Sequence, residues 1–308
     1  MLIPKVTFWF PLLLGVSTCE QDNVVHAADA PTSPTTARTA ALPVEQFTIL
    51  LAWYRDLGER RDEEAFGALV VRAARIQLGK PYDKSPQSSE PEVLRVDLTQ
   101  FQCVSLVESS LAVASCVWQN HATEQCFVRE IESMRYRDGK MDGFASRLHY
   151  APDWLSDNER RGRYTLLTAL LGGQPVSHRF DFMSKHPRFY PALAAPDVAR
   201  EIRTIEERLS ANGHYVLSRD LVAKAEPQFH DGDIVAVVSN RKPGLLVGHI
   251  GFVDVSEKGT PRLLHASSHH KRVLLTSSSI ASYLAGRPYR LGLMLARPLP
   301  PNSSRDAD

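Results

Sequence analysis

The order of hydrophobic periods along the chain is the feature that most limits its fold. The first half carries apolar residues at helical spacing, which predicts helices at 44–57, 62–78, 103–120 and 122–134. The last third has short runs of Val, Ile and Leu between Gly, Pro and Ser, which predict strands at 233–239, 247–255, 262–266, 272–276 and 291–297. Helices first and strands last predict the α+β class, with N-terminal helices packed on a C-terminal antiparallel sheet.

Three further segments carry local signals. Gly79-Lys80-Pro81 is expected to stop the second helix, since neither Gly nor Pro continues one. Residues 93–98 are expected to be a short extended segment. Residues 135–158 show no sustained period and many aromatic and polar side chains, which is typical of a segment that lines a site.

The N-terminus has the pattern of an export signal. Lys5 precedes an apolar run at 6–16, and an A-x-A-like cleavage site follows, with cleavage expected after Ala27. The run is too short to span a bilayer, for which roughly 20 residues are needed. We therefore expect an exported protein, periplasmic or extracellular, without a transmembrane segment in the mature chain. Alternatively, Cys19 lies in a lipoprotein-like signal and would be lipid-anchored.

The remaining boundaries follow from composition. Beyond the signal peptide at 1–27, residues 28–43 are rich in Ala, Pro, Thr and Ser and read as a flexible linker. Residues 44–300 then form the folded domain, and residues 301–308 are a disordered tail. Lys and Arg number 36 against 35 Asp and Glu, a formal charge of +1, so the composition favours neither nucleic acid nor an anionic membrane as a partner.

The cysteines single out one thiol. Removal or lipidation of Cys19 leaves three cysteines, an odd number for an oxidising compartment. Cys116 and Cys126 lie ten residues apart across an expected helix–helix turn and could form a disulfide, which would leave Cys103 as a free thiol. Cys103 begins a predicted helix, whose positive end lowers a thiol pKa.

Two histidines could complete the chemistry of that thiol. His249 and His265 both lie in predicted strands, which would hold an imidazole in a fixed position. A cysteine on a helix, a base on one strand and an orienting group on another follow the logic of a Cys–His catalytic triad. Each residue alone is more often structural, because buried cysteines commonly act as small hydrophobic residues.

Six segments in order give the chain a family resemblance. They are LGKPY (78–82), LTQFQCVSLVESSLAVA (98–114), MRYRDGKMDGFASRLHYAPDW (134–154), FMSKHPRFY (182–190), VGHIGFV (247–253) and LLHASSHHKRV (263–273). Together they resemble the N-acetylmuramoyl-L-alanine amidase-like family, a branch of the NlpC-type papain-like cell-wall hydrolases. The resemblance implies a papain-like (NlpC-type) fold with an antiparallel sheet or half-barrel, and amide hydrolysis in peptidoglycan or muropeptide fragments.

The resemblance also implies roles for particular residues. Cys103 would be the nucleophile, His249 the general base, His265 the residue that orients that base, and Tyr82 a group near the oxyanion with the Cys103 N–H. The family usually has Asp before the cysteine, whereas this chain has Gln102.

The segment 134–154 would shape the substrate cleft in the same family. Its candidate substrate-binding residues are Arg147, His149, Tyr150 and Trp154. Arg147 could bind a carboxylate of the stem peptide, and Tyr150 or Trp154 could stack on a sugar. An equally simple expectation is that Arg147 holds its own loop together.

Three alternatives stay open at this point. The same chemistry could cut the D-glutamyl–diaminopimelate bond of the stem instead of the muramoyl–L-alanine bond. A zinc amidase could use His249 and His265 with a carboxylate, although no H-E-x-x-H spacing is present. Finally, the chain could be a glycan-binding module without turnover, an idea that Gln102 keeps open. We expect no cofactor, no metal and a monomer.

Overall fold

The computed structural model describes residues 41–85, 91–255 and 259–301, which belong to one compact unit spanning residues 39–308. The expected signal peptide, Cys19, nearly all of the expected linker and all but the first residue of the expected tail lie outside the described residues. The helices are α1 (Val44–Leu57), α2 (Phe66–Arg75), α3 (Cys103–Trp118), α4 (Glu124–Arg135), α5 (Gly143–Ser146), α6 (Ala151–Arg160), α7 (Phe182–Lys185), α8 (Pro196–Ala211), α9 (Arg219–Ala225) and α10 (Ile280–Ala285). The strands are β1 (Tyr164–Leu166), β2 (Gln174–Val176), β3 (His214–Ser218), β4 (Ile234–Ser239), β5 (Val247–Val255), β6 (Pro261–Ser267), β7 (Arg272–Ser279) and β8 (Arg290–Pro298). None of the described helices is long and apolar enough to cross a membrane.

The strands form one antiparallel sheet in the order β2-β3-β8-β4-β5-β6-β7, with β1 paired to β8. The four strands from β4 to β7 are consecutive hairpins, and β8 returns to pair with β4. The predicted α+β class, with helices first and an antiparallel sheet last, is therefore confirmed.

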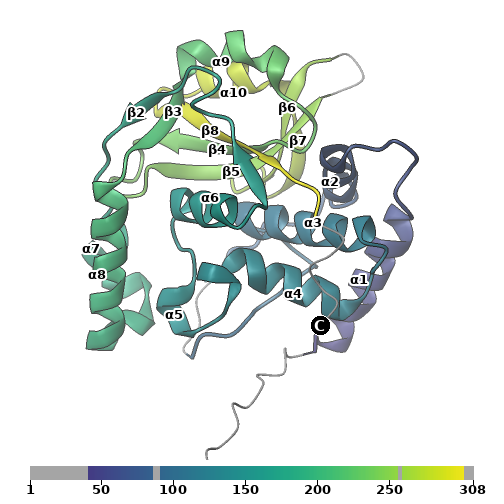
Figure 1. Ribbon diagram of the computed structural model, residues 1–308, viewed down its shortest axis with the longest axis horizontal. Helices are drawn as coiled ribbons and strands as arrows, with labels where there is room; N and C mark the ends of the chain where they lie inside the picture. Colours follow the sequence, from purple (N-terminus) through teal and green to yellow (C-terminus); the bar gives the residue numbers. More distant parts are fainter. Residues whose placement is uncertain (1–40, 86–90, 256–258, 302–308) are drawn as a thin grey trace, which may run out of the picture. The chain divides into compact units, whose positions relative to one another are not determined.

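Strand β4 shows why this sheet is buried on both faces. Ile234, Ala236 and Val238 point into the larger hydrophobic cluster, which includes α2, α3 and α4. The alternate residues Val235 and Val237 point into a second cluster with α9 and α10. A strand covered on both faces reads as a continuous apolar run rather than an alternating one, as IVAVV does here. Figure 1 shows α9 and α10 on one side of the strands and α3 on the other.

Helix α3 is the central helix of the larger cluster. It packs against α2, α4 and β5, and all its residues from Leu106 to Val117 are buried. Cys116 and Cys126 form a disulfide that joins α3 to α4, which is the pairing that the sequence made possible. Cys103 is the free cysteine of the described residues. Helix α3 is thus fixed in place, and its first residue lies beside the sheet.

Several local predictions differ from the structure. The second helix is shorter than 62–78, because residues 76–79 form turns and Gly79 adopts a φ of +88°. Residues 93–97 have no regular secondary structure, so the expected extended segment does not join the sheet. The segment 135–158 is not irregular throughout, since it holds α5 and most of α6. Strands β1 to β3 were not predicted; β1 and β2 have three residues each, too few to show a period.

Candidate active site

The N-terminus of α3 carries the candidate nucleophile. Cys103 is the first residue of the helix, and Gln102 is its cap. The Gln102 N–H donates to Ser105 Oγ at 2.9 Å, which is one half of a capping box. The Gln102 side chain also donates to the carbonyl oxygen of Ser85 at 2.8 Å, a bond that an aspartate could not make. Gln102 therefore caps the helix and ties it to the loop that follows Tyr82.

The sulfur of Cys103 lies among backbone N–H groups. The N–H groups of Ile250, Val104 and Cys103 itself all hydrogen bond to it and favour the thiolate. Burial of the sulfur outweighs them, however, so that the pKa of the thiol is raised above its ordinary value. The expectation that the helix N-terminus would lower this pKa is thus wrong in its net direction, although the N–H groups do act in that sense. The resting cysteine is a thiol.

The two candidate histidines contact each other directly. Nε2 of His249 lies 2.6 Å from Nδ1 of His265, and the two rings meet edge to face. Ile250 directly follows His249 and donates its N–H to the Cys103 sulfur, so β5 passes the thiol at the residue next to this histidine. The fold therefore brings the histidine-bearing part of β5 near the thiol, which is compatible with the triad hypothesis.

Gly251 makes room for this histidine pair. A Cβ at this position would lie 2.7 Å from the carbonyl oxygen of Leu264 and 2.9 Å from Cβ of His265. The pairing of β5 with β6 begins at Phe252 and Leu264, so His249, which pairs with Val237 of β4, lies beyond the part of β5 that pairs with β6. The missing side chain at Gly251 and the end of the β5–β6 hydrogen-bond ladder together let the two imidazoles meet between β5 and β6.

Both imidazoles are held neutral. Burial and the charge of Arg290 lower the pKa of His249 to about 4. Burial, followed by His249 and Arg290, lowers the pKa of His265 to about 2. The other nitrogen of His265, Nε2, is buried and has no hydrogen-bond partner among the described residues. At pH 7 the site therefore holds a thiol and two neutral imidazoles.

Tyr82 lies close to the thiol, as the family pattern implied. Its N–H donates to the carbonyl oxygen of Lys271 at 2.9 Å, and it bridges to Phe101, two residues before Cys103. Burial and the neighbouring Cys103 and Asp83 raise the pKa of Tyr82 to about 12. The phenol therefore keeps its proton and can donate a hydrogen bond beside the sulfur.

The residues predicted to shape a substrate cleft are largely structural. Arg147 forms an ion pair with Glu92 at 3.0 Å, and Glu92 also accepts from the Tyr136 hydroxyl. Arg147 therefore ties its segment to the stretch that precedes α3, a structural role that differs from both expectations, a stem-peptide carboxylate or its own loop. His149 Nε2 lies 2.8 Å from the carbonyl oxygen of Phe144.

The two predicted sugar-stacking rings are both inside the core. Tyr150 is 2% exposed and donates to Glu206 at 2.6 Å. Trp154 is 3% exposed and packs against Tyr164. The expectation that either ring stacks on a sugar is inconsistent with this burial, since neither ring has an open face.

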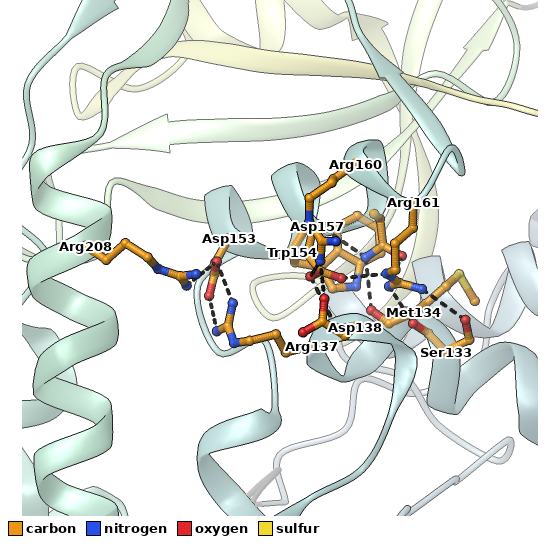
Figure 2. Close-up of polar contacts among 11 residues, drawn as sticks. Ser133, Met134, Arg137, Asp138, Asp153, Trp154, Asp157, Arg160, Arg161 and Arg208 are labelled. Carbon is orange, nitrogen blue, oxygen red and sulfur yellow. Dashed lines mark hydrogen bonds and ion pairs between the residues drawn. The ribbon is translucent and has the colours of Figure 1, made fainter.

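An ion-pair network explains why this segment is so rich in polar residues. Asp153 is bracketed by Arg137 and Arg208, at 2.6 and 3.0 Å (Figure 2). One turn further along α6, Asp157 accepts from Arg160 and Arg161. The network fixes α6 against its neighbours, so the irregular hydrophobic pattern reflects buried ion pairs.

Two residues near the histidines were missed by the sequence analysis. The guanidinium of Arg290 lies 3.6 Å from the ring centroid of Tyr283, and that ring lies 5.6 Å from the ring of His265. Neither residue belongs to a segment with a recognisable motif, and both lie beyond the last matching segment. Within the described ranges, no three His, Cys, Asp or Glu side chains come together as a metal ion would require.

Comparisons with known proteins place this geometry in a family. The family model described as N-acetylmuramoyl-L-alanine amidase-like matches residues 72–292, a span that includes Tyr82, Cys103, His249 and His265. The chain belongs to this amidase-like family. No curated protein matches it.

Solved structures agree with the amidase-like assignment. A crystal structure of an N-acetylmuramoyl-L-alanine amidase from Bacteroides uniformis is 30% identical, with a TM-score of 0.69, and the match covers 76% of this chain and 98% of that one. A Bacteroides fragilis protein, provisionally described as a xylanase, is also 30% identical, with a TM-score of 0.67 and coverage of 73% and 98%. A Legionella pneumophila protein at 14% identity, with a TM-score of 0.61 and coverage of 83% and 95%, shares the fold.

Proposed function

We propose that this protein is an exported cysteine hydrolase of peptidoglycan, with a papain-like (NlpC-type) arrangement, that cuts the amide bond between N-acetylmuramic acid and L-alanine. The observation that carries the proposal is that the Ile250 N–H meets the Cys103 sulfur while the adjoining residue, His249, contacts His265. The amidase-like family supports the muramoyl bond over the D-glutamyl–diaminopimelate bond. The N-terminal sequence supports export.

The first chemical step uses the neutral resting pair. For His249 to accept the thiol proton at Nδ1, its Nε2 must carry hydrogen and donate to Nδ1 of His265. His265 then carries its own hydrogen on Nε2. As the sulfur attacks the lactyl carbonyl carbon, the thiol proton passes to His249. The imidazolium of His249 therefore forms only as the carbon–sulfur bond forms.

The second half releases both products. The protonated His249 gives its proton to the leaving amine as the carbon–nitrogen bond breaks, which leaves a thioester on Cys103. Water, activated by the now neutral His249, hydrolyses the thioester and restores the thiol. The N–H of Cys103 and the hydroxyl of Tyr82, whose proton is retained, would stabilise the oxyanion in both halves.

Product analysis tests this proposal. The mature protein and its Cys103→Ala variant are incubated with purified muropeptides, and products are identified by mass spectrometry. Release of peptides with a free L-alanine amine by the wild type alone is the expected result. Fragments that begin at diaminopimelate would move the cut to the stem. No change with either protein would favour a binding module without turnover.

A further inference from the structure

A half-buried arginine without a carboxylate partner lies beside the histidine pair. Arg290 begins β8 and stacks on Tyr283, whose ring contacts His265. Its guanidinium donates to the carbonyl oxygen of Tyr283, and it forms no ion pair with any acidic residue in the described part of the chain. Most buried arginines here do the opposite: Arg135, for example, lies 2.7 Å from Glu108.

Two more cations, Arg241 and Lys242, lie in the β4–β5 loop. Arg241 shares the ring of Tyr289 with Arg290, at 5.4 Å for Arg241 against 5.9 Å for Arg290. Lys242 follows in the β4–β5 loop with its ammonium 5.9 Å from the ring of Phe182, and its charge lowers the pKa of the Cys103 thiol. Neither Arg241 nor Lys242 has an acidic partner among the residues that the structure describes. We call Arg241, Lys242 and Arg290 the cationic rim.

Arg290 is the unusual member of the rim, because it is half-buried and has no acidic partner among the described residues. Half-buried arginines elsewhere in the described ranges are commonly paired, as Arg161 and Arg297 are, whereas exposed cations often are not. A partly desolvated arginine is costly unless an anion neutralises it. Stacking on Tyr283 orders the guanidinium without neutralising it, which leaves its planar fork of donors available to a carboxylate.

We propose that the cationic rim binds the free carboxylates of an acidic stem peptide, with Arg290 on the carboxylate nearest the scissile amide. This inference rests on the proposed function. In a muramoyl peptide that group is the α-carboxylate of the γ-linked D-glutamate, one residue beyond L-alanine. The rim would therefore select stems in which this carboxylate is free over stems in which it is amidated.

Paired substrates test the contact itself. Two synthetic muramoyl tripeptides, identical except for a free or an amidated D-glutamate α-carboxyl, are hydrolysed by wild type, Arg290→Gln, Arg290→Lys and Arg203→Gln. Arg203 is an exposed arginine on α8 and serves as the matched loss of charge. A charge-assisted hydrogen bond predicts that wild type prefers the free acid by about 10- to 100-fold in kcat/KM, mostly through KM.

The variants separate recognition from a structural role. Arg290→Gln should lose the preference, Arg290→Lys should keep part of it, and Arg203→Gln should keep all of it. Equal losses on both substrates in Arg290→Gln would overturn the proposal, because Arg290 would then act through the histidines. An unaltered preference in that variant would overturn it as well.

The proposed function can fail separately. If wild type hydrolyses neither substrate, the hydrolase proposal fails, and the preference is measured as binding of the two peptides by calorimetry. Tighter binding of the free acid, lost in Arg290→Gln, would support the rim. Equal binding of both peptides by wild type would overturn it.

Discussion

Acidification provides a sharp test of the neutral resting site. In the unfolded chain His249 has its ordinary pKa of 6.5, whereas in the fold burial and Arg290 lower that pKa to about 4. Between these values the unfolded chain binds more protons than the folded protein, so stability falls as the pH falls from about 6.5 towards 4. Integrated down to pH 4, the contribution of His249 to this loss is about 3 kcal/mol.

A difference between variants isolates that contribution. Urea unfolding of wild type and His249→Gln is measured at pH 7 and at pH 4 without reductant, and the free energy of unfolding is extrapolated to water. Titrating groups that do not interact with His249 cancel in the comparison, and His265 loses the influence of His249 in the variant, so wild type should lose at least about 3 kcal/mol more than His249→Gln. His121→Gln, which removes an exposed histidine, should keep the wild-type loss.

Two results would refute this reasoning. A difference below about 1 kcal/mol between wild type and His249→Gln would mean that the folded site accepts a proton as readily as the unfolded chain. Burial would then not hold His249 neutral. Rapid alkylation of Cys103 by iodoacetamide at pH 5 would show a thiolate in the resting site, because a raised thiol pKa predicts alkylation that accelerates only in the alkaline range.

Three further changes probe the scaffold of the site. Replacing Cys116 and Cys126 by serine opens a loop of ten residues and should lower the free energy of unfolding by about 2.5 kcal/mol with little change in kcat, as measured by urea unfolding and turnover. Gly251→Ala places a methyl 2.9 Å from Cβ of the second histidine and should lower kcat at least about tenfold; unchanged turnover would contradict the account of the histidine pair. Glu108→Gln leaves the buried guanidinium of Arg135 without its charge partner and should cost about 3 kcal/mol in urea unfolding, while a loss under 1 kcal/mol would show that the pair contributes little.

The sequence predicted the sheet better than the middle of the chain. The five C-terminal strands have clear apolar runs bounded by turn residues, and all five form strands close to the predicted limits. The prediction of an irregular segment at 135–158 failed because buried ion pairs replace apolar residues there. Asp153 and Asp157 are buried and form ion pairs with arginines. A prediction from hydrophobic pattern assigns such charged residues to the surface.

The site shows a similar division. Tyr82, Cys103, His249 and His265 lie in segments with recognisable motifs; the fold places Tyr82 near the Cys103 sulfur and His249 against His265. Arg290 belongs to no recognisable motif. Its proposed role follows from the lack of an acidic partner among the described residues, which only three-dimensional contacts reveal. Tyr150 and Trp154 were misread because large polar-tipped aromatic residues fill cores as readily as they line clefts.

The covalent intermediate tests the central claim most directly. Wild type and Cys103→Ala are mixed with a muropeptide, quenched in acid within the first turnovers, and weighed as intact proteins. We predict a thioester on the wild type alone, with the mass of the muramic-acid saccharide and no amino acid. An adduct that also contains L-alanine and D-glutamate would contradict the bond assignment, and turnover without any adduct, or an adduct on Cys103→Ala, would contradict Cys103 as the nucleophile.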